Sequence, residues 1–183
     1  MMKKYLAPLL LTLLVFCFGH NAAAEPANRE LTLDEKTEVL FGTDSPDFYL
    51  YVNARFGFSV LVPAIFDTAS VIPDNGDGII LTDKTETYRF TASGSNVIDE
   101  EINGLKSLYE SSTEYLGDTL KESSFSDNSF SLLSLDEGQY TFQMTSADGS
   151  TLYSLEIVYP ENAPDSFKAQ VSKSAESLKK SDS

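Results

Sequence analysis

The sequence YTFQMTSADGSTLYSLEIVYP, residues 140–160, contains the clearest hairpin signal in this 183-residue chain. Aromatic and aliphatic residues occupy every second position on both sides of Ser146-Ala147-Asp148-Gly149, and such alternation is typical of half-buried strands. Asp followed by Gly is a common turn sequence between antiparallel strands. These residues therefore predict a β-hairpin that ends at Pro160.

A second hairpin is predicted nearer the N-terminus by the same alternation. Phe48, Leu50 and Val52 precede a turn at Asn53-Ala54-Arg55, and a further alternating run ends at Pro63. Short apolar runs at residues 69–72, 78–81 and 87–92 follow, joined by connections rich in Gly and Asp. Such short connections favour a meander of antiparallel strands over parallel strands with helical crossovers.

Two helices are predicted from changes in the apolar period. Ile98, Ile102, Leu105, Tyr109 and Leu116 fall on one helical stripe, which predicts a helix with Asn96 as N-cap and Gly117 at its end. A closing amphipathic helix is predicted after Pro164 from the apolar residues Phe167, Val171, Ala175 and Leu178. The serine-rich residues 123–135 between the two strand groups are interpreted as a loop that leads into a strand. The predicted class is α+β, an antiparallel sheet of hairpins and meander packed with two α-helices.

The N-terminus has the pattern of a secretory signal peptide. Lys3 and Lys4 precede an apolar run, and small residues at positions 22–24 end it, so we expect cleavage after Ala24 and a periplasmic or secreted protein. An uncleaved anchor and a lipoprotein attached through Cys17 are less favoured alternatives, because the apolar run is short for a membrane span and Phe16 is bulky for a lipidation site. The expected segments are a signal peptide (1–24), a leader (25–47), one domain (48–178) and a polar tail (179–183).

Cleavage changes the chemistry that is available. It would remove Cys17, His20 and two lysines and leave 11 basic against 28 acidic residues, a formal charge of −17. A chain without histidine or cysteine excludes Ser-His-Asp and Cys-His catalysis and thiolate or imidazole metal sites. The strong negative charge makes nucleic acid an unsuitable partner, and it favours either solubility or a basic partner.

Two of the predicted strands carry a resemblance to a known family. The sequence NARFGFSVLVP at residues 53–63 is similar to the opening of PsbP-like domains, and YSLEIVYP at residues 153–160, followed by an amphipathic helix, is similar to their end. The resemblance covers residues 48–178, with this chain as a secreted bacterial member. It implies an antiparallel sheet with helices packed on it, in a superfamily that includes photosystem accessory proteins and bacterial periplasmic proteins. It implies no functional residue.

One loop has the composition of a calcium site. Asp74, Asn75 and Asp77 lie among glycines and offer oxygen ligands, so they are the candidate calcium ligands. The spacing does not fit an EF-hand, because Pro73 stands where the first ligand belongs and the twelfth position carries no Glu. Asn, Gly and Asp are also the residues of ordinary exposed turns, and that interpretation is preferred. No other cofactor is expected.

Two function classes are left open. The preferred one is a non-enzymatic accessory protein that binds a protein or a cell-envelope component, with Tyr49 and Tyr51 as a contact surface if their side of the strand faces outward; a buried second face is the alternative for both tyrosines. The other class is a carboxylate-dependent or calcium-assisted hydrolase outside the cytoplasm. The acids Asp99, Glu100 and Glu101 are better interpreted as a solvated helix face than as a catalytic pair.

Overall fold

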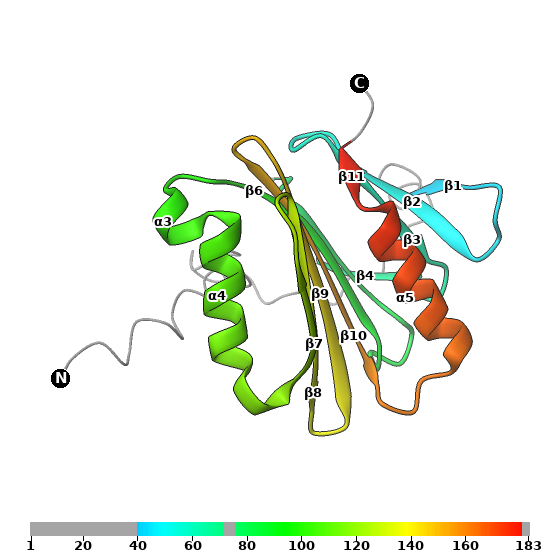
Figure 1. The fold of residues 1–183 in the computed structure, drawn as a ribbon. Coiled ribbons are helices and arrows are strands. Elements are labelled where there is room, and N and C mark those ends of the chain that lie inside the picture. Colours follow the sequence, from blue (N-terminus) through cyan, green and yellow to red (C-terminus); the bar gives the residue numbers. More distant parts are fainter. Residues whose placement is uncertain (1–39, 72–75, 181–183) are drawn as a thin grey trace, which may run out of the picture.

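The computed structural model describes residues 40–71 and 76–180, which form two antiparallel sheets with helices packed against them (Figure 1). The predicted signal peptide and most of the predicted leader lie outside the described residues. The smaller sheet has the order β1-β2-β3-β11. Its strands are β1 (Leu40–Gly42), β2 (Phe48–Asn53), β3 (Phe58–Pro63) and β11 (Lys179–Lys180).

The larger sheet has seven strands in the order β4-β5-β6-β10-β9-β8-β7. The strands are β4 (Thr68–Val71), β5 (Gly78–Thr82), β6 (Arg89–Asn96), β7 (Leu120–Phe125), β8 (Ser129–Asp136), β9 (Gln139–Asp148) and β10 (Thr151–Pro160). The predicted C-terminal hairpin is confirmed as β9 and β10, which pair from Thr151↔Asp148 to Pro160↔Gln139. Because β10 also pairs with β6, this hairpin joins the two halves of the sheet.

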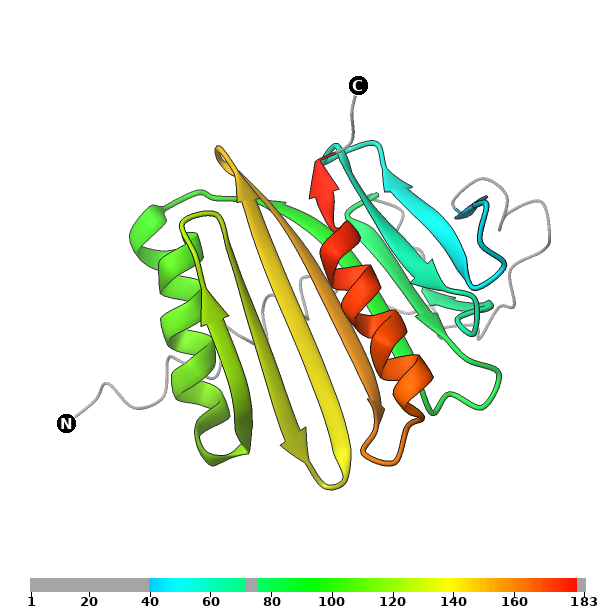
Figure 2. The ribbon, with the colours of Figure 1, turned by 45° about the vertical axis from the view of Figure 1, so that its right-hand side comes forward.

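One face of the large sheet packs against helix α5 (Asp165–Ser177) and the small sheet, as Figure 2 shows. The predicted closing helix is therefore confirmed. Phe167 from α5 lies within 4.8–6.1 Å of three rings, those of Tyr88, Tyr159 and Phe66. Phe58 of the small sheet stacks on Tyr153 of β10 at 5.7 Å. These apolar contacts fix the small sheet on the large one.

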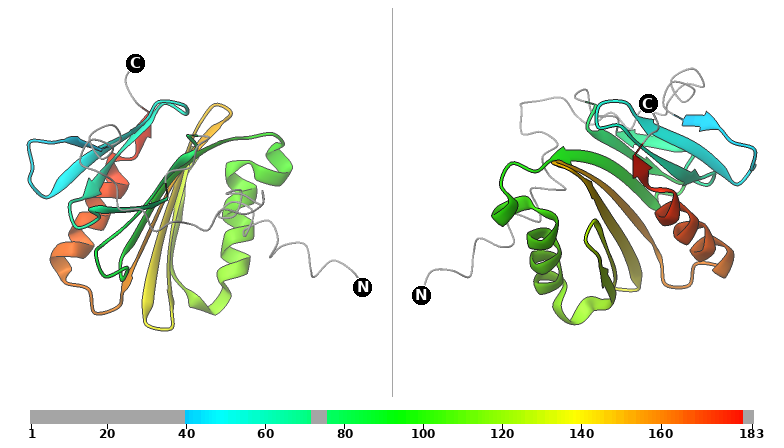
Figure 3. Two further views of the ribbon diagram at one scale, coloured as in Figure 1. Left: turned by 180° about the vertical axis from the view of Figure 1, so that it is seen from behind. Right: turned by 45° about the horizontal axis from the view of Figure 1, so that its top comes forward.

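The opposite face of the large sheet packs against helix α4 (Leu105–Leu116), so α4 and α5 lie on different sides of it (Figure 3). Leu105 and Leu108 of α4 form a second apolar cluster with Phe130, Leu132 and Leu152 of the sheet. Leu152 belongs to this cluster and its neighbour Tyr153 to the first one, because successive side chains of a strand point to opposite faces. No helix of the described residues is long and apolar enough to span a membrane.

The single helix predicted from Ile98 to Leu116 is wrong in its first third. The structure has a one-turn helix, α3 (Glu100–Asn103), then a break at Gly104, then α4. A Cβ at position 104 would lie 2.5 Å from the backbone carbonyl oxygen of Glu100, so this break fits only glycine. The N-cap is Asp99 and not Asn96, whereas Gly117 does cap the end of α4 as predicted.

The strand expected at the end of residues 123–135 is present as β8, but the loop expected before it contains the end of a further strand, β7. β7 follows a 3-10 turn (Gly117–Thr119) and pairs with β8 in a hairpin. Every residue of β7 after Leu120 is exposed. Its serine and charged side chains therefore lie in solvent, and such residues are compatible with a strand at the edge of a sheet. At the two ends, β1 lies within the expected leader and pairs with β2, and Lys179–Lys180 of the expected tail pairs with β3.

Candidate functional site

The candidate calcium loop contributes one described ligand, Asp77. A carboxylate oxygen of Asp77 lies 2.5 Å from the Arg55 guanidinium, and the Asp77 carbonyl accepts from the Gly94 N–H at 2.7 Å. Asp74 and Asn75 lie outside the described residues. The Asp77 carboxylate therefore already has a cationic partner on the β2–β3 turn, and a calcium ion would have to compete with it. Within residues 40–71 and 76–180, no group of three or more His, Cys, Asp or Glu side chains could hold a metal.

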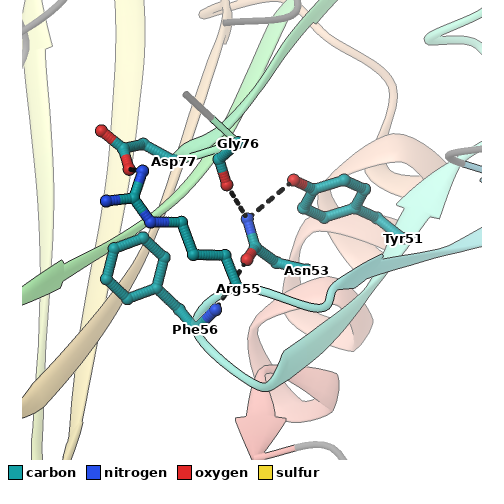
Figure 4. A network of polar contacts seen from close by, with 6 residues as sticks. All are labelled: Tyr51, Asn53, Arg55, Phe56, Gly76 and Asp77. Atoms are coloured by element: carbon teal, nitrogen blue, oxygen red, sulfur yellow. Dashed lines mark hydrogen bonds and ion pairs between the residues drawn. The ribbon is translucent and has the colours of Figure 1, made fainter. Parts of the chain in front are cut away.

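Asn53, which sequence reasoning did not single out, is the centre of a polar network beside this ion pair (Figure 4). Its amide nitrogen donates to the Tyr51 hydroxyl at 3.1 Å and to the Gly76 carbonyl at 3.0 Å, and its oxygen accepts from the Phe56 N–H at 2.9 Å. Asn53 is buried. Because Asn53 is buried and these hydrogen bonds go to groups of the chain itself, the network ties the β2–β3 turn to Gly76. The sequence signal for this role of Asn53 is its position at the end of a strand, where an Asn side chain can bond to the backbone of the following turn.

The two tyrosines of the candidate contact surface differ in exposure. Tyr49 is 36% exposed, whereas Tyr51 is 4% exposed and packs its ring against Phe58 at 5.9 Å. Burial raises the pKa of Tyr51, although the hydrogen bond with Asn53 lowers it in part. Tyr51 therefore follows the buried alternative and cannot form part of an exposed surface. Tyr49 stays available as a contact residue.

Asp83 is the carboxylate most deeply enclosed by hydrogen bonds. It is buried in the β5–β6 turn and accepts from the Thr85 hydroxyl, the Thr85 N–H at 3.1 Å and the Tyr88 N–H at 2.8 Å. Burial alone would raise the pKa of Asp83, but these hydrogen bonds outweigh it, and the net pKa is lowered. A carboxyl group held in its ionised form is unsuited to act as a general acid, so Asp83 does not support the hydrolase hypothesis.

The predicted solvated acids are exposed. Glu100, Glu101, Glu110 and Glu114 all face solvent, and Glu110 pairs with Lys106 at 3.7 Å. Asp99 accepts from the Glu101 N–H at 2.9 Å and so acts as the N-cap of α3. This arrangement is that of a solvated helix face, as predicted.

The two most exposed large aliphatic side chains of the described residues lie on the segment of residues 97–104, here called the α3 loop. Ile98 is 90% exposed and Ile102 is 55% exposed. The sequence pattern placed both residues on the apolar stripe of one continuous helix, so this surface was missed. The signals that could have found it are Asp99, which can cap a helix that begins at the next residue, and Gly104, which can end one.

Hydrogen bonds hold the α3 loop in one conformation. The Asn103 side-chain oxygen accepts from the N–H groups of Ile98 and Asp99 at 3.1 and 2.9 Å, and its amide nitrogen donates to the Asn96 carbonyl at 3.1 Å. The Val97 N–H donates to the Ser150 carbonyl at 2.7 Å and so joins the loop to the β9–β10 turn. The structure thus presents two isoleucines to solvent from an ordered backbone.

Comparisons with known proteins give a match in structure but not in sequence. No family model matches the chain, and no curated protein matches it. A solved structure of a mutant of the protein Mog1 aligns with a TM-score of 0.47 at 8% identity, over 74% of this chain and 97% of that chain.

A better match is the solution structure of cyanobacterial PsbP (CyanoP) from Synechocystis sp. PCC 6803. It aligns with a TM-score of 0.57 at 11% identity and covers 76% of this chain and 96% of that chain. An identity this low says nothing of shared activity. It does confirm the architecture implied by the sequence resemblance: this chain has the PsbP-like fold, with two antiparallel sheets and two main helices.

Proposed function

We propose that this chain is an exported accessory protein that acts by binding a partner in the cell envelope and not by catalysis. The observation that carries the proposal is the ordered display of Ile98 and Ile102 on the α3 loop. Exposed isoleucines lose the stabilisation that burial would give, so an ordered backbone that presents two of them favours a contact made outside the chain.

The composition supports the same proposal. After removal of residues 1–24 the chain would contain no histidine and no cysteine, which leaves carboxylates as the main candidates for acid–base chemistry. Three carboxylates of the described residues serve other purposes: Asp83 orders a turn, Asp77 pairs with Arg55, and Asp99 caps a helix. The hydrolase alternative thus has no observation in its favour at these residues.

The binding proposal is tested by affinity capture from the native envelope fraction, with the tagged full chain expressed at its natural level. We expect a protein recovered reproducibly in near-equal amount to the bait. The control for non-specific capture is a matched sample in which the tagged protein is added only after the envelope has been solubilised. If no protein is enriched over that control, the binding function is wrong.

The export proposal needs a separate measurement. We expect cell fractionation to place the protein outside the cytoplasm and N-terminal sequencing of the recovered chain to begin at Glu25. Recovery of the chain with residues 1–24 still attached in the membrane fraction would instead support the anchor alternative. A lipid-modified Cys17 at the N-terminus would support the lipoprotein alternative.

A further inference from the structure

We propose that the α3 loop is the anchor of this contact, and that it inserts Ile98 and Ile102 into an apolar pocket with a basic rim on a protein partner. This inference rests on the proposed binding function and specifies its surface and the chemistry of the partner. It goes beyond the sequence prediction, in which both isoleucines lay on the apolar stripe of one continuous helix.

The geometry of the loop suits an anchor. Ile98 lies just before the cap residue Asp99, and Ile102 lies four residues later, inside the one-turn helix α3, which ends at Gly104. The Ser107 hydroxyl donates to the carbonyls of Glu100 and Glu101 at 3.2 and 3.0 Å, which ties the turn to α4. A backbone that is already ordered loses little conformational entropy on binding, and affinity gains accordingly.

The charges around the isoleucines define the partner. Asp99, Glu100 and Glu101 are exposed and follow directly after Ile98. Across residues 97–119 there are six carboxylates and one basic residue, Lys106, which already pairs with Glu110. Apolar side chains beside three carboxylates are complementary to an apolar pocket bordered by lysine or arginine, because opposite charges at the rim steer association and reject other surfaces.

The same charges disfavour two other occupants. A lipid surface would have to take up Asp99 and Glu100 together with Ile98, and carboxylates are costly near hydrocarbon and repelled by anionic head groups. A second copy of the exported chain would bring the acidic surroundings of one loop toward another surface of a protein with a formal charge of −17. A basic protein surface is therefore the occupant that the loop fits.

The test is site-specific photocrosslinking in the cells that produce the protein. Benzoylphenylalanine replaces Ile98 or Ile102 in the full chain, and Tyr49 or Tyr115 at exposed positions elsewhere. We expect adducts with one and the same protein from positions 98 and 102, and mapping of the crosslinked peptide to an apolar site flanked by Lys or Arg.

The acidic residues of the loop are tested by charge reversal. The double variant Glu100→Lys, Glu101→Lys, crosslinked from position 98, should lower the adduct yield about tenfold, because it places positive charge against the basic rim. The matched double variant Glu114→Lys, Asp118→Lys carries the same charge change at exposed positions near the far end of α4 and should leave the yield unchanged. An equal loss of yield in both double variants would show that net charge, and not the rim of the loop, governs the contact.

Each other outcome overturns part of the proposal. Adducts from position 49 or 115 alone would leave the binding function standing and place the contact elsewhere. No adduct from any of the four positions would count against the binding function itself. An adduct with the mass of two copies would identify self-association.

A separate experiment tests a lipid surface. If the protein sedimented with vesicles of phosphatidylethanolamine and phosphatidylglycerol, and Ile98→Ser abolished this sedimentation, the loop would bind lipid instead of a protein. Since Ile98 is 90% exposed, Ile98→Ser should retain the melting temperature and exclude misfolding as the cause.

Discussion

The side-chain amide of Asn53 donates to the Gly76 carbonyl oxygen at 3.0 Å and so links the β2–β3 turn of the small sheet to the residue two positions before β5 of the large one. The same amide reaches the Tyr51 hydroxyl, and the Asn53 oxygen accepts from the Phe56 N–H. A single buried side chain thus connects a tyrosine of β2, the β2–β3 turn and the segment before β5. Its removal should be felt in the stability of the whole domain.

Asn53→Ala should lower the free energy of unfolding by about 2–3 kcal/mol, because the buried Tyr51 hydroxyl and two part-buried backbone groups lose these hydrogen bonds. Asn162→Ala, at an exposed position, is the matched control and should change it by no more than about 0.5 kcal/mol. Urea unfolding followed by tyrosine fluorescence or circular dichroism gives both values. Equal effects of the two variants would show that the network does not stabilise the fold.

Calcium at millimolar concentration should leave the melting temperature unchanged. The reason is that Asp77, the described member of the candidate ligand set, already pairs with Arg55 at 2.5 Å. Differential scanning calorimetry with about 5 mM calcium, magnesium or chelator makes the comparison, since a ligand bound only by the folded state raises the melting temperature. A rise with calcium but not with magnesium, lost in Asp77→Asn, would establish a calcium site instead.

The sequence predicts secondary structure best where a pattern of apolar residues fits only one kind of element. Alternation through Tyr153, Leu155 and Ile157 predicted β10 because each of these residues is buried on one face. Tyr49 and Tyr51 lie on the same side of β2, so alternation could not distinguish them, and only the packing of the domain shows that Tyr51 is buried and Tyr49 is exposed. β7 was missed because an edge strand needs few apolar residues.

The α3 loop shows a different limit of prediction. Ile98 and Ile102 fit the apolar stripe of α4 in sequence, but the hydrogen bonds of Asn103 and the break at Gly104 turn them away from the core. Periodicity measures spacing along a continuous helix and is blind to such a break. The exposed pair therefore became visible only in the structure.

Gly94→Ala should destabilise the domain, because a Cβ at position 94 would lie 2.3 Å from Cγ of the Phe56 ring. Overpacking of this kind costs about 1–3 kcal/mol. In a double-mutant cycle the same substitution should cost less in a Phe56→Gly background, where both the ring and the Phe56 Cβ, itself 2.5 Å from the added carbon, are gone. Gly42→Ala is the control, since no atom lies within 4 Å of the added carbon there. Strict additivity of the two substitutions would argue against the contact.

Stability should decrease as the pH rises above about 10. Burial raises the pKa of Tyr51, Tyr153 and Tyr159 above the ordinary value of 10.0, so the unfolded chain loses these protons first. The unfolded state then binds fewer protons than the folded state, and each such tyrosine lowers the free energy of unfolding by up to about 1.4 kcal/mol per pH unit. Tyr51→Phe should make the decline between pH 9 and 11 less steep, whereas Tyr115→Phe, at an exposed position, should not. An identical slope in both variants would contradict the burial of Tyr51.

Asp83→Asn should destabilise the protein at pH 7 by about 2 kcal/mol, because the amide offers one acceptor oxygen where the carboxylate uses two, and the hydrogen bonds lose their charge. The pKa of Asp83 is lowered in the folded state from its ordinary value of 3.8, so its contribution is present above that pH and is lost as the pH falls through the folded pKa. The difference in the free energy of unfolding between the wild type and the variant should therefore shrink between pH 7 and pH 2. Urea titrations at several pH values measure this difference directly. A gap that stays constant down to pH 2 would mean that the turn is held by its backbone and not by the ionised carboxylate.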